Sequence, residues 1–185
     1  MRGGHGGRGN THFATATPNG PIRNAFGSNP NTTVRASNAV QYFLPAGLGG
    51  LEGGLMLAAG EGGVVANGLT KSTGIRLGWA SGPFGISAAT VTSENNQTTT
   101  GKFKDTALGG NAAFGDLKLT AAWRKFEQST AEQTNIILGA VYSIGQSDLK
   151  FSYLKANMAG RVGTTSIDAN DATQLGLGYI YNLSK

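Results

Sequence analysis

The chain has 185 residues, of which 39% are hydrophobic and only 14% are charged, and its formal net charge at pH 7 is +5. A typical soluble domain carries about 25% charged residues, so this surface would be unusually poor in charge. Cysteine is absent, which excludes disulfides, thiolate metal sites and a cysteine nucleophile, and no apolar run approaches the roughly 18 residues of a membrane-spanning helix.

Residues 1–34 are rich in Gly, Asn, Thr and Pro and show no periodicity, which predicts a loop or a non-native start to the chain. Its arginines are followed by no apolar segment, so no secretory signal peptide is predicted. The letters GHGGRG match a dinucleotide-binding fingerprint, but they follow no strand and open no helix. Contact with RNA through the Arg-Gly letters stays open as a weak alternative, and we expect no cofactor and no nucleic-acid partner.

From about residue 35 onward, apolar and polar residues alternate, and we find no convincing helix. The domain organisation that follows is a loop at 1–34 and one β-sheet segment at 35–185. The alternation predicts nine strands, at roughly 35–44, 51–60, 72–80, 84–93, 103–114, 116–127, 133–144, 148–157 and 171–182.

The stretch DLKLTAAWRKF, residues 116–126, can be interpreted in two ways. Its odd positions carry Leu, Leu, Ala and Trp, and its even positions carry Asp, Lys, Thr, Ala and Arg. A soluble sandwich or meander would bury the Leu and Trp side, whereas a transmembrane barrel would show that side to lipid and keep Lys and Arg around water. A soluble or surface β-sheet protein with a binding or structural role therefore remains the alternative to a membrane barrel.

The connections favour the barrel, because short and long ones alternate along the chain. Short connections are predicted near 46–50, 81–83, 115–116 and 145–147, and long ones lie between them, including EQSTAEQ and the stretch from about 156 to 171. Large aromatic residues fall beside the short connections, as in the interfacial girdle of a membrane barrel. The predicted lipid-interface aromatics are Trp79, Phe84, Phe114, Trp123, Tyr142, Phe151 and Tyr181.

The polar parity supplies the candidate functional residues. Arg76, Lys118, Arg124 and Lys150 share this parity and would line a water-filled lumen, where their positive field would concentrate anions. Both histidines fall within 1–34 without an acidic partner, and the Asp and Glu residues assemble no hydrolytic pair. The sequence therefore predicts no catalytic residue, no metal site and no enzymatic activity.

Four stretches resemble one family. They are VRASNAVQYFLPAGLGGLEGGLMLAAGE, GIRLGWASGPFGISAAT, LGGNAAFGDLKLTAAW and QLGLGYIYNLSK, and they are similar to successive hairpins of the general trimeric porins of Gram-negative bacteria, especially those of the Burkholderiales type. The resemblance covers about residues 34–185. It implies an antiparallel up-and-down barrel of sixteen strands, of which nine would be represented here, and it adds Arg35, the motif arginine, to the pore-lining set.

The same resemblance implies a function and a location. The expected function is passive diffusion of small hydrophilic solutes and ions, with a preference for anions, across the outer membrane. The expected partners are outer-membrane lipid, two further copies in a homotrimer, and small anions. Because the constriction loop and seven of the sixteen strands have no counterpart, the chain is expected to be a fragment.

Overall fold

The computed structural model describes residues 38–60, 71–94 and 102–183, and the regular structure within them is entirely β. Among these residues, no helix has the length and apolar character needed to cross a membrane. The predicted domain boundary near residue 34 and the pore-lining candidate Arg35 lie outside the described part. The strands are β1 (Ala39–Phe43), β2 (Leu51–Ala58), β3 (Lys71–Ser81), β4 (Phe84–Glu94), β5 (Phe103–Phe114), β6 (Leu117–Gln128), β7 (Ala131–Ile144), β8 (Ser147–Ala159), β9 (Arg161–Val162), β10 (Thr165–Ser166) and β11 (Ala172–Tyr181).

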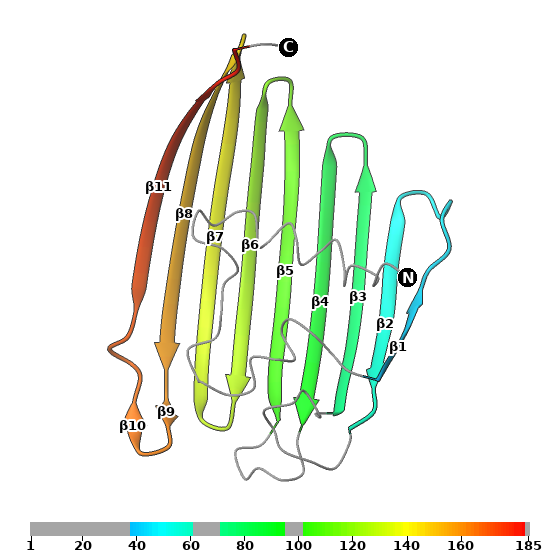
Figure 1. Cartoon of the computed structure of the whole chain (residues 1–185), viewed down its shortest axis with the longest axis vertical. Helices are drawn as coiled ribbons and strands as arrows, with labels where there is room; N and C mark the ends of the chain where they lie inside the picture. The colour runs from blue at the N-terminus through cyan, green and yellow to red at the C-terminus, as the bar shows by residue number, and fades with distance from the viewer. Residues whose placement is uncertain (1–37, 61–70, 95–101, 184–185) are drawn as a thin grey trace.

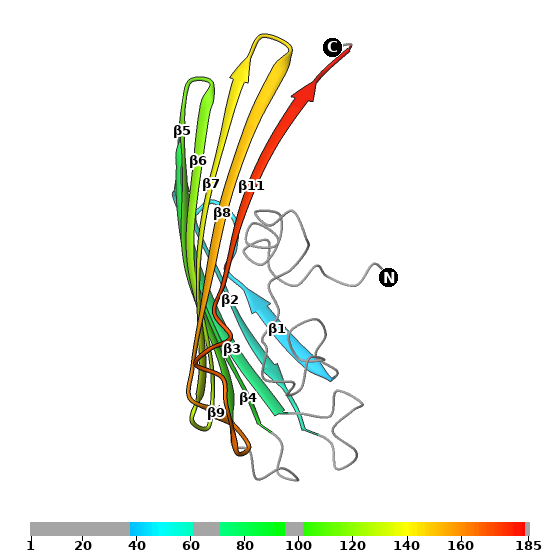
Figure 2. The same ribbon diagram turned by 90° about the vertical axis from the view of Figure 1, so that its left-hand side faces the viewer.

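Nine of these strands form a single antiparallel sheet in the order β1-β2-β3-β4-β5-β6-β7-β8-β11, so each strand pairs with its neighbours along the chain (Figure 1). Seen from the side, the sheet is a curved and twisted wall (Figure 2). The two remaining strands, β9 and β10, form a small hairpin inserted between β8 and β11. The predicted all-β, antiparallel, up-and-down architecture is confirmed, and the nine predicted strands agree closely with the observed ones.

Three of the predicted short connections are two-residue turns that begin with glycine. Gly82, Gly115 and Gly145 have φ values of 52°, 58° and 59°. A positive φ at the first turn residue is the geometry of the primed hairpin turns, which match the twist of the flanking strands. A two-residue turn also fixes which residues face one another in the two strands. All three turns lie at the same end of the sheet, which we call the tight-turn end; we call the opposite end the long-loop end.

One predicted long connection is wrong. The stretch EQSTAEQ belongs almost entirely to strands, because β6 runs to Gln128 and β7 starts at Ala131. Only Ser129 and Thr130 remain between them, and Ser129 adopts a φ of 55° without being glycine. Polar residues suggested a loop, but they occupy regular strand positions at the long-loop end. The alternation of short and long connections is therefore interrupted at this place.

The two faces of the sheet differ as the alternation predicts. The side chains of Leu177, Leu57 and Trp79 remain 79%, 62% and 44% exposed, whereas Asn135 and Arg124, on the opposite parity, are buried. We call the face with the exposed apolar residues the outer face, and the opposite one the inner face. The soluble alternative required the apolar parity to be the buried one, and the structure has it exposed.

Candidate functional site

The exposed apolar residues of the outer face form a band that runs obliquely across the strands. At the long-loop end, the last apolar residue of β2 is Leu57, whose cross-strand row reaches Ala159 on β8. On β11 the corresponding limit is Leu175, which pairs with Tyr153, six residues before Ala159 (159 − 153). This limit of the band therefore moves six residues toward the tight-turn end across the sheet.

The other limit moves in parallel. At the tight-turn end, the apolar residues of β2 stop at Leu51, whose row reaches Leu175 on β11. On β11 they continue to Tyr181, six residues beyond (181 − 175). We call the residues between these limits the apolar band: Leu51, Leu55, Leu57, Ile75, Leu77, Trp79, Phe84, Ile86, Leu108, Phe114, Leu119, Trp123, Ile136, Leu138, Tyr142, Ile144, Leu149, Phe151, Leu175, Leu177, Tyr179 and Tyr181.

The dimensions of the apolar band are those of a sheet that crosses a bilayer at a tilt. A shift of six residues is about 20 Å, and the seven steps from β2 to β11 span about 34 Å, so the strands are inclined by about 30° to the band normal. Transmembrane barrels tilt their strands by about 35–45° and carry an apolar band about 25 Å tall. The band covers seven residues, or six residue steps, on β2, β6 and β11 alike. This gives about 18 Å between the terminal Cα atoms along the band normal, not counting the side chains.

Five of the seven predicted interface aromatics follow the tight-turn limit of the apolar band. Phe84 and Phe114 pack edge to face there, with ring centroids 5.8 Å apart. Trp123 lies at the opposite limit, because beyond it β6 continues with Lys125 on the same face. The five at the tight-turn limit are Trp79, Phe84, Phe114, Tyr142 and Tyr181, whereas Phe151 lies near the middle of the band on β8.

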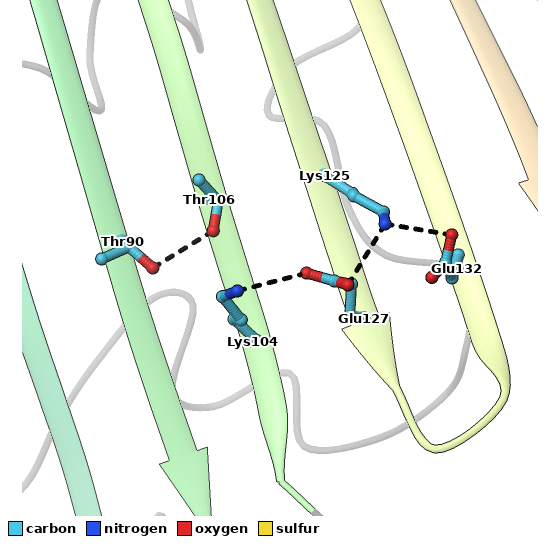
Figure 3. A network of polar contacts seen from close by, with 6 residues as sticks. All are labelled: Thr90, Lys104, Thr106, Lys125, Glu127 and Glu132. Atoms are coloured by element: carbon cyan, nitrogen blue, oxygen red, sulfur yellow. Dashed lines mark hydrogen bonds and ion pairs between the residues drawn. The ribbon is translucent and has the colours of Figure 1, made fainter.

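A polar network occupies the outer face just beyond the apolar band, at the long-loop end (Figure 3). Lys125 Nζ lies 3.1 Å from Glu127 Oε1 and 3.0 Å from Glu132 Oε2, and Lys104 Nζ lies 3.6 Å from Glu127 Oε2. Beside them, the hydroxyls of Thr90 and Thr106 are 3.1 Å apart. Charged side chains on the outer face thus begin where the band stops.

The inner face carries the predicted pore-lining residues, and the structure divides them into two groups. Arg76 and Arg124 share one cross-strand row, three strands apart. Lys118 and Lys150 share another row, two strands apart. Along β6, the two rows are separated by the six residues from Lys118 to Arg124, or about 20 Å. The four basic residues therefore form two separate pairs at two heights.

Arg124 is held by a carboxylate that the sequence analysis left unassigned. Its Nε donates to Asp105 Oδ1 at 2.9 Å, and its Nη2 donates to Asp105 Oδ2 at 2.6 Å. The side chains are only 8% and 15% exposed. The guanidinium also lies over the Phe126 ring, 4.7 Å from its centroid. Two parallel charge-assisted hydrogen bonds and a cation–π contact fix this arginine as a neutral pair rather than a free positive charge.

Arg76 has a looser partner. Its Nη2 lies 3.4 Å from Glu52 Oε2, and the Glu52 side chain is half exposed. The other terminal nitrogen, Nη1, is buried and has no partner. This pair contributes less than the Arg124 pair, because an exposed ion pair with one long contact is worth at most about 1 kcal/mol.

Lys118 and Lys150 are exposed, and neither ammonium forms an ion pair within the described part of the chain. Asp148 lies near them on the inner face and accepts a hydrogen bond from Ser143 Oγ at 2.7 Å. The exposed positive charge of the inner face is thus concentrated at the tight-turn end.

The pairing of Arg124 with Asp105 could have been found from the sequence. The turn at Gly115 places Phe114 opposite Leu117, and this register puts Asp105 opposite Phe126, diagonal to Arg124. Diagonal neighbours on one face of an antiparallel pair are within reach of long side chains.

Comparison with known proteins gives a consistent result. A family model described as Gram-negative porin matches residues 5–185. No curated protein sequence matches the chain. Among solved structures, a porin refined at 1.8 Å resolution is similar with a TM-score of 0.64 and 13% identity, over 89% of this chain and 57% of that chain. OmpF of Salmonella typhi in complex with daunomycin is similar with a TM-score of 0.65 and 17% identity, over 94% and 60%. The chain therefore spans less than two thirds of the porins it matches.

Proposed function

Since the chain belongs to the Gram-negative porin family, we propose that it forms part of the wall of a passive outer-membrane channel for small hydrophilic solutes and ions. Porins are channels without enzymatic activity, so transport needs no catalytic residue. The observation that carries the proposal is the oblique apolar band on the outer face, of constant height and opposite a polar inner face. Lipid would cover the band, and water would fill the space on the inner side.

The wall requires further strands. Within the described residues, β1 and β11 each pair on one side only. Unpaired backbone N–H and C=O groups in a bilayer core cost several kcal/mol each, which is why membrane β-structures are closed. We therefore regard the nine-stranded sheet as part of a larger ring, in agreement with the 57–60% of the matched porins that it covers.

The assembly of this ring into a homotrimer, and its membership of the Burkholderiales type, belong to the proposal. The support for both is the similarity of the four quoted stretches, together with the fold. A native gel of the detergent-extracted protein, run before and after heating, tests the trimer; a single species of unchanged mobility would contradict it.

We also propose that the channel prefers anions to cations. Lys118 and Lys150 support it, because they are exposed on the inner face. Arg76 and Arg124 support it less, because each is paired with a carboxylate. The expected selectivity is therefore modest and originates near the tight-turn end.

The experiment that tests the proposal is reconstitution of the protein, extracted from outer membranes, into a planar lipid bilayer. Discrete ohmic current steps are expected, with a reversal potential on the anion side under a KCl gradient. The double variant Lys118→Glu, Lys150→Glu should move that potential toward cations, whereas Arg76→Gln should move it less. Absence of current steps would refute the channel, and steps without a shift in the double variant would refute only the origin of the selectivity.

A further inference from the structure

The segment 160–171, which we call the strap, lies at the long-loop end of the sheet beside the β6–β7 turn. There the connection between β6 and β7 is only two residues long. A Cβ atom on Gly160 would overlap the carbonyl oxygen of Thr130, so the two backbones touch. Thr130 Oγ1 also donates to the Arg161 carbonyl at 3.4 Å. The β9–β10 hairpin is thus held against the β6–β7 turn.

The strap continues onto the inner face, where Ile167 is inserted into an apolar cluster. Ile167 is only 7% exposed and packs with Phe103, Phe126 and Ala131, with Met158 at the margin. The two phenylalanine rings are stacked with centroids 5.9 Å apart. All four of these sheet residues belong to inner-face rows, since they share the parity of Asp105 and Arg124.

Hydrogen bonds fix the path of the strap in detail. Gly160 N donates to Asp168 Oδ1 at 2.6 Å, and Ile167 N donates to the Gly160 carbonyl at 3.0 Å. At the far end, Met158 N donates to Asp171 Oδ1 at 2.8 Å. The strap is therefore an ordered piece of the inner wall, tied at both ends, and it cannot be treated as a loose surface loop.

From these contacts we infer that the strap is a constriction element on the long-loop side of the channel, and that Ile167 is the residue that positions it. This inference rests on the proposed function. The β9–β10 hairpin lies at the foot of β8 and β11 (Figure 1), and Ile167 joins an inner-face cluster with residues of β5, β6 and β7. Through the Phe126 ring of this cluster, the strap is linked to the Arg124–Asp105 pair. Solute size at this end is set by where Ile167 holds the strap.

Thiol labelling tests the inference without requiring a current, because the chain has no cysteine of its own. Single cysteines are introduced as Ala131→Cys under the strap, Ala107→Cys deeper on the inner face, and Thr164→Cys as an exposed reference on the hairpin. Isolated outer membranes are treated with a small methanethiosulfonate and with a maleimide on a long polyethylene glycol chain. The reagents should modify Ala131→Cys and Ala107→Cys at least ten-fold more slowly than Thr164→Cys, and the large reagent should show the greater difference.

The positioning role is tested by Ile167→Ser, with Val162→Ser as the matched control, because Val162 lies on the same hairpin and is 39% exposed. Ile167→Ser should raise both buried labelling rates about ten-fold and enlarge the current steps and the largest permeating sugar, and Val162→Ser should change neither. Equal labelling of Ala131→Cys, Ala107→Cys and the reference, or no response to Ile167→Ser, would overturn the inference. A labelling response with unchanged step size and size limit would also overturn the constriction.

Absence of current in every variant would refute the proposed channel instead. The discrimination between the small and the large reagent at Ala107→Cys would then decide by itself whether the strap restricts access to the inner face. If the small and the large reagent modified Ala107→Cys equally fast in the protein that keeps Ile167, the inference would be overturned without any current measurement.

Discussion

The oblique course of the apolar band predicts that two positions in one cross-strand row respond differently to the same charge. Leu77 on β3 and Thr173 on β11 belong to a single row of the outer face. The band on β2 is centred on Gly54, which pairs with Arg76, and a shift of about one residue per strand places Leu77 at mid-height. On β11 the centre is Gly178, five residues from Thr173, or about 15 Å along the band normal.

An arginine at these two positions should therefore differ in cost. At the middle of a bilayer, arginine on the lipid face of a barrel costs about 2–4 kcal/mol, and near the interfaces it costs about 0–1 kcal/mol. Leu77→Arg should lower the free energy of unfolding by about 2–4 kcal/mol, and Thr173→Arg should leave it nearly unchanged. After correction for loss of the leucine, the remaining difference arises from depth, because the cross-strand row, the face and the new side chain are the same.

Urea unfolding of the protein folded into phosphatidylcholine vesicles measures this difference, with Trp79 and Trp123 as fluorescent reporters. Leu77→Ala serves as the control for loss of the leucine itself, and its cost is subtracted from the cost of Leu77→Arg. Equal costs for the two arginine variants would refute the tilt deduced from the register. A small cost for both would refute the membrane-facing assignment of the band.

Three further outcomes are expected. In a double-mutant cycle, Asp105→Asn and Arg124→Gln should show a coupling of about 1–3 kcal/mol in urea unfolding, because the bidentate pair is mostly shielded from water; additive effects would contradict its strength. Gly160→Ala should speed amide hydrogen exchange throughout the strap, because its φ of 91° and the Thr130 carbonyl leave no room for a methyl group, whereas Gly163→Ala, with nothing within 4 Å, should be milder. The hydrogen bond from the backbone N–H of Gly160, and then that from the Ser166 hydroxyl, lower the pKa of Asp168. The hydrogen bonds of the Asp168 carboxylate therefore stabilise the strap fully above the ordinary carboxylate pKa of about 4, and this stabilisation is lost as the pH falls through the lowered pKa. Amide exchange in the strap that does not depend on pH in the acid range, after correction for intrinsic rates, would contradict this.

Alternation and turn glycines account for most of what the sequence predicted correctly. The period of two holds on each long strand because one face meets a different environment from the other, and a one-residue error would exchange the faces. Gly82, Gly115 and Gly145 mark the turns because a positive φ is required there. The prediction failed at Ser129, where a non-glycine residue takes the same conformation and leaves no compositional signal. The residues around Ser129 are polar because they lie at the long-loop end of the sheet, beyond the apolar band.

The sequence predicted which basic residues share a face of the sheet, but it did not predict which side chains contact them. Parity placed Arg76, Lys118, Arg124 and Lys150 on one face, and the structure agrees. Their pairing was missed because the strand register was not used to place Asp105 and Glu52 near them. The strap was missed for a different reason: Ile167 stands alone in a polar stretch, and its partners are distant in sequence, so no local pattern reveals its burial.

The number of strands in the sheet restricts how the ring can be completed. In an up-and-down sheet of nine strands, β1 and β11 run in the same direction. Joining them directly would create a parallel pair. A second copy inserted in the same orientation would present the same mismatch at both seams. Closure by antiparallel pairs alone requires an odd number of additional strands, so whatever completes the proposed ring must contribute an odd number, as the described sheet itself does.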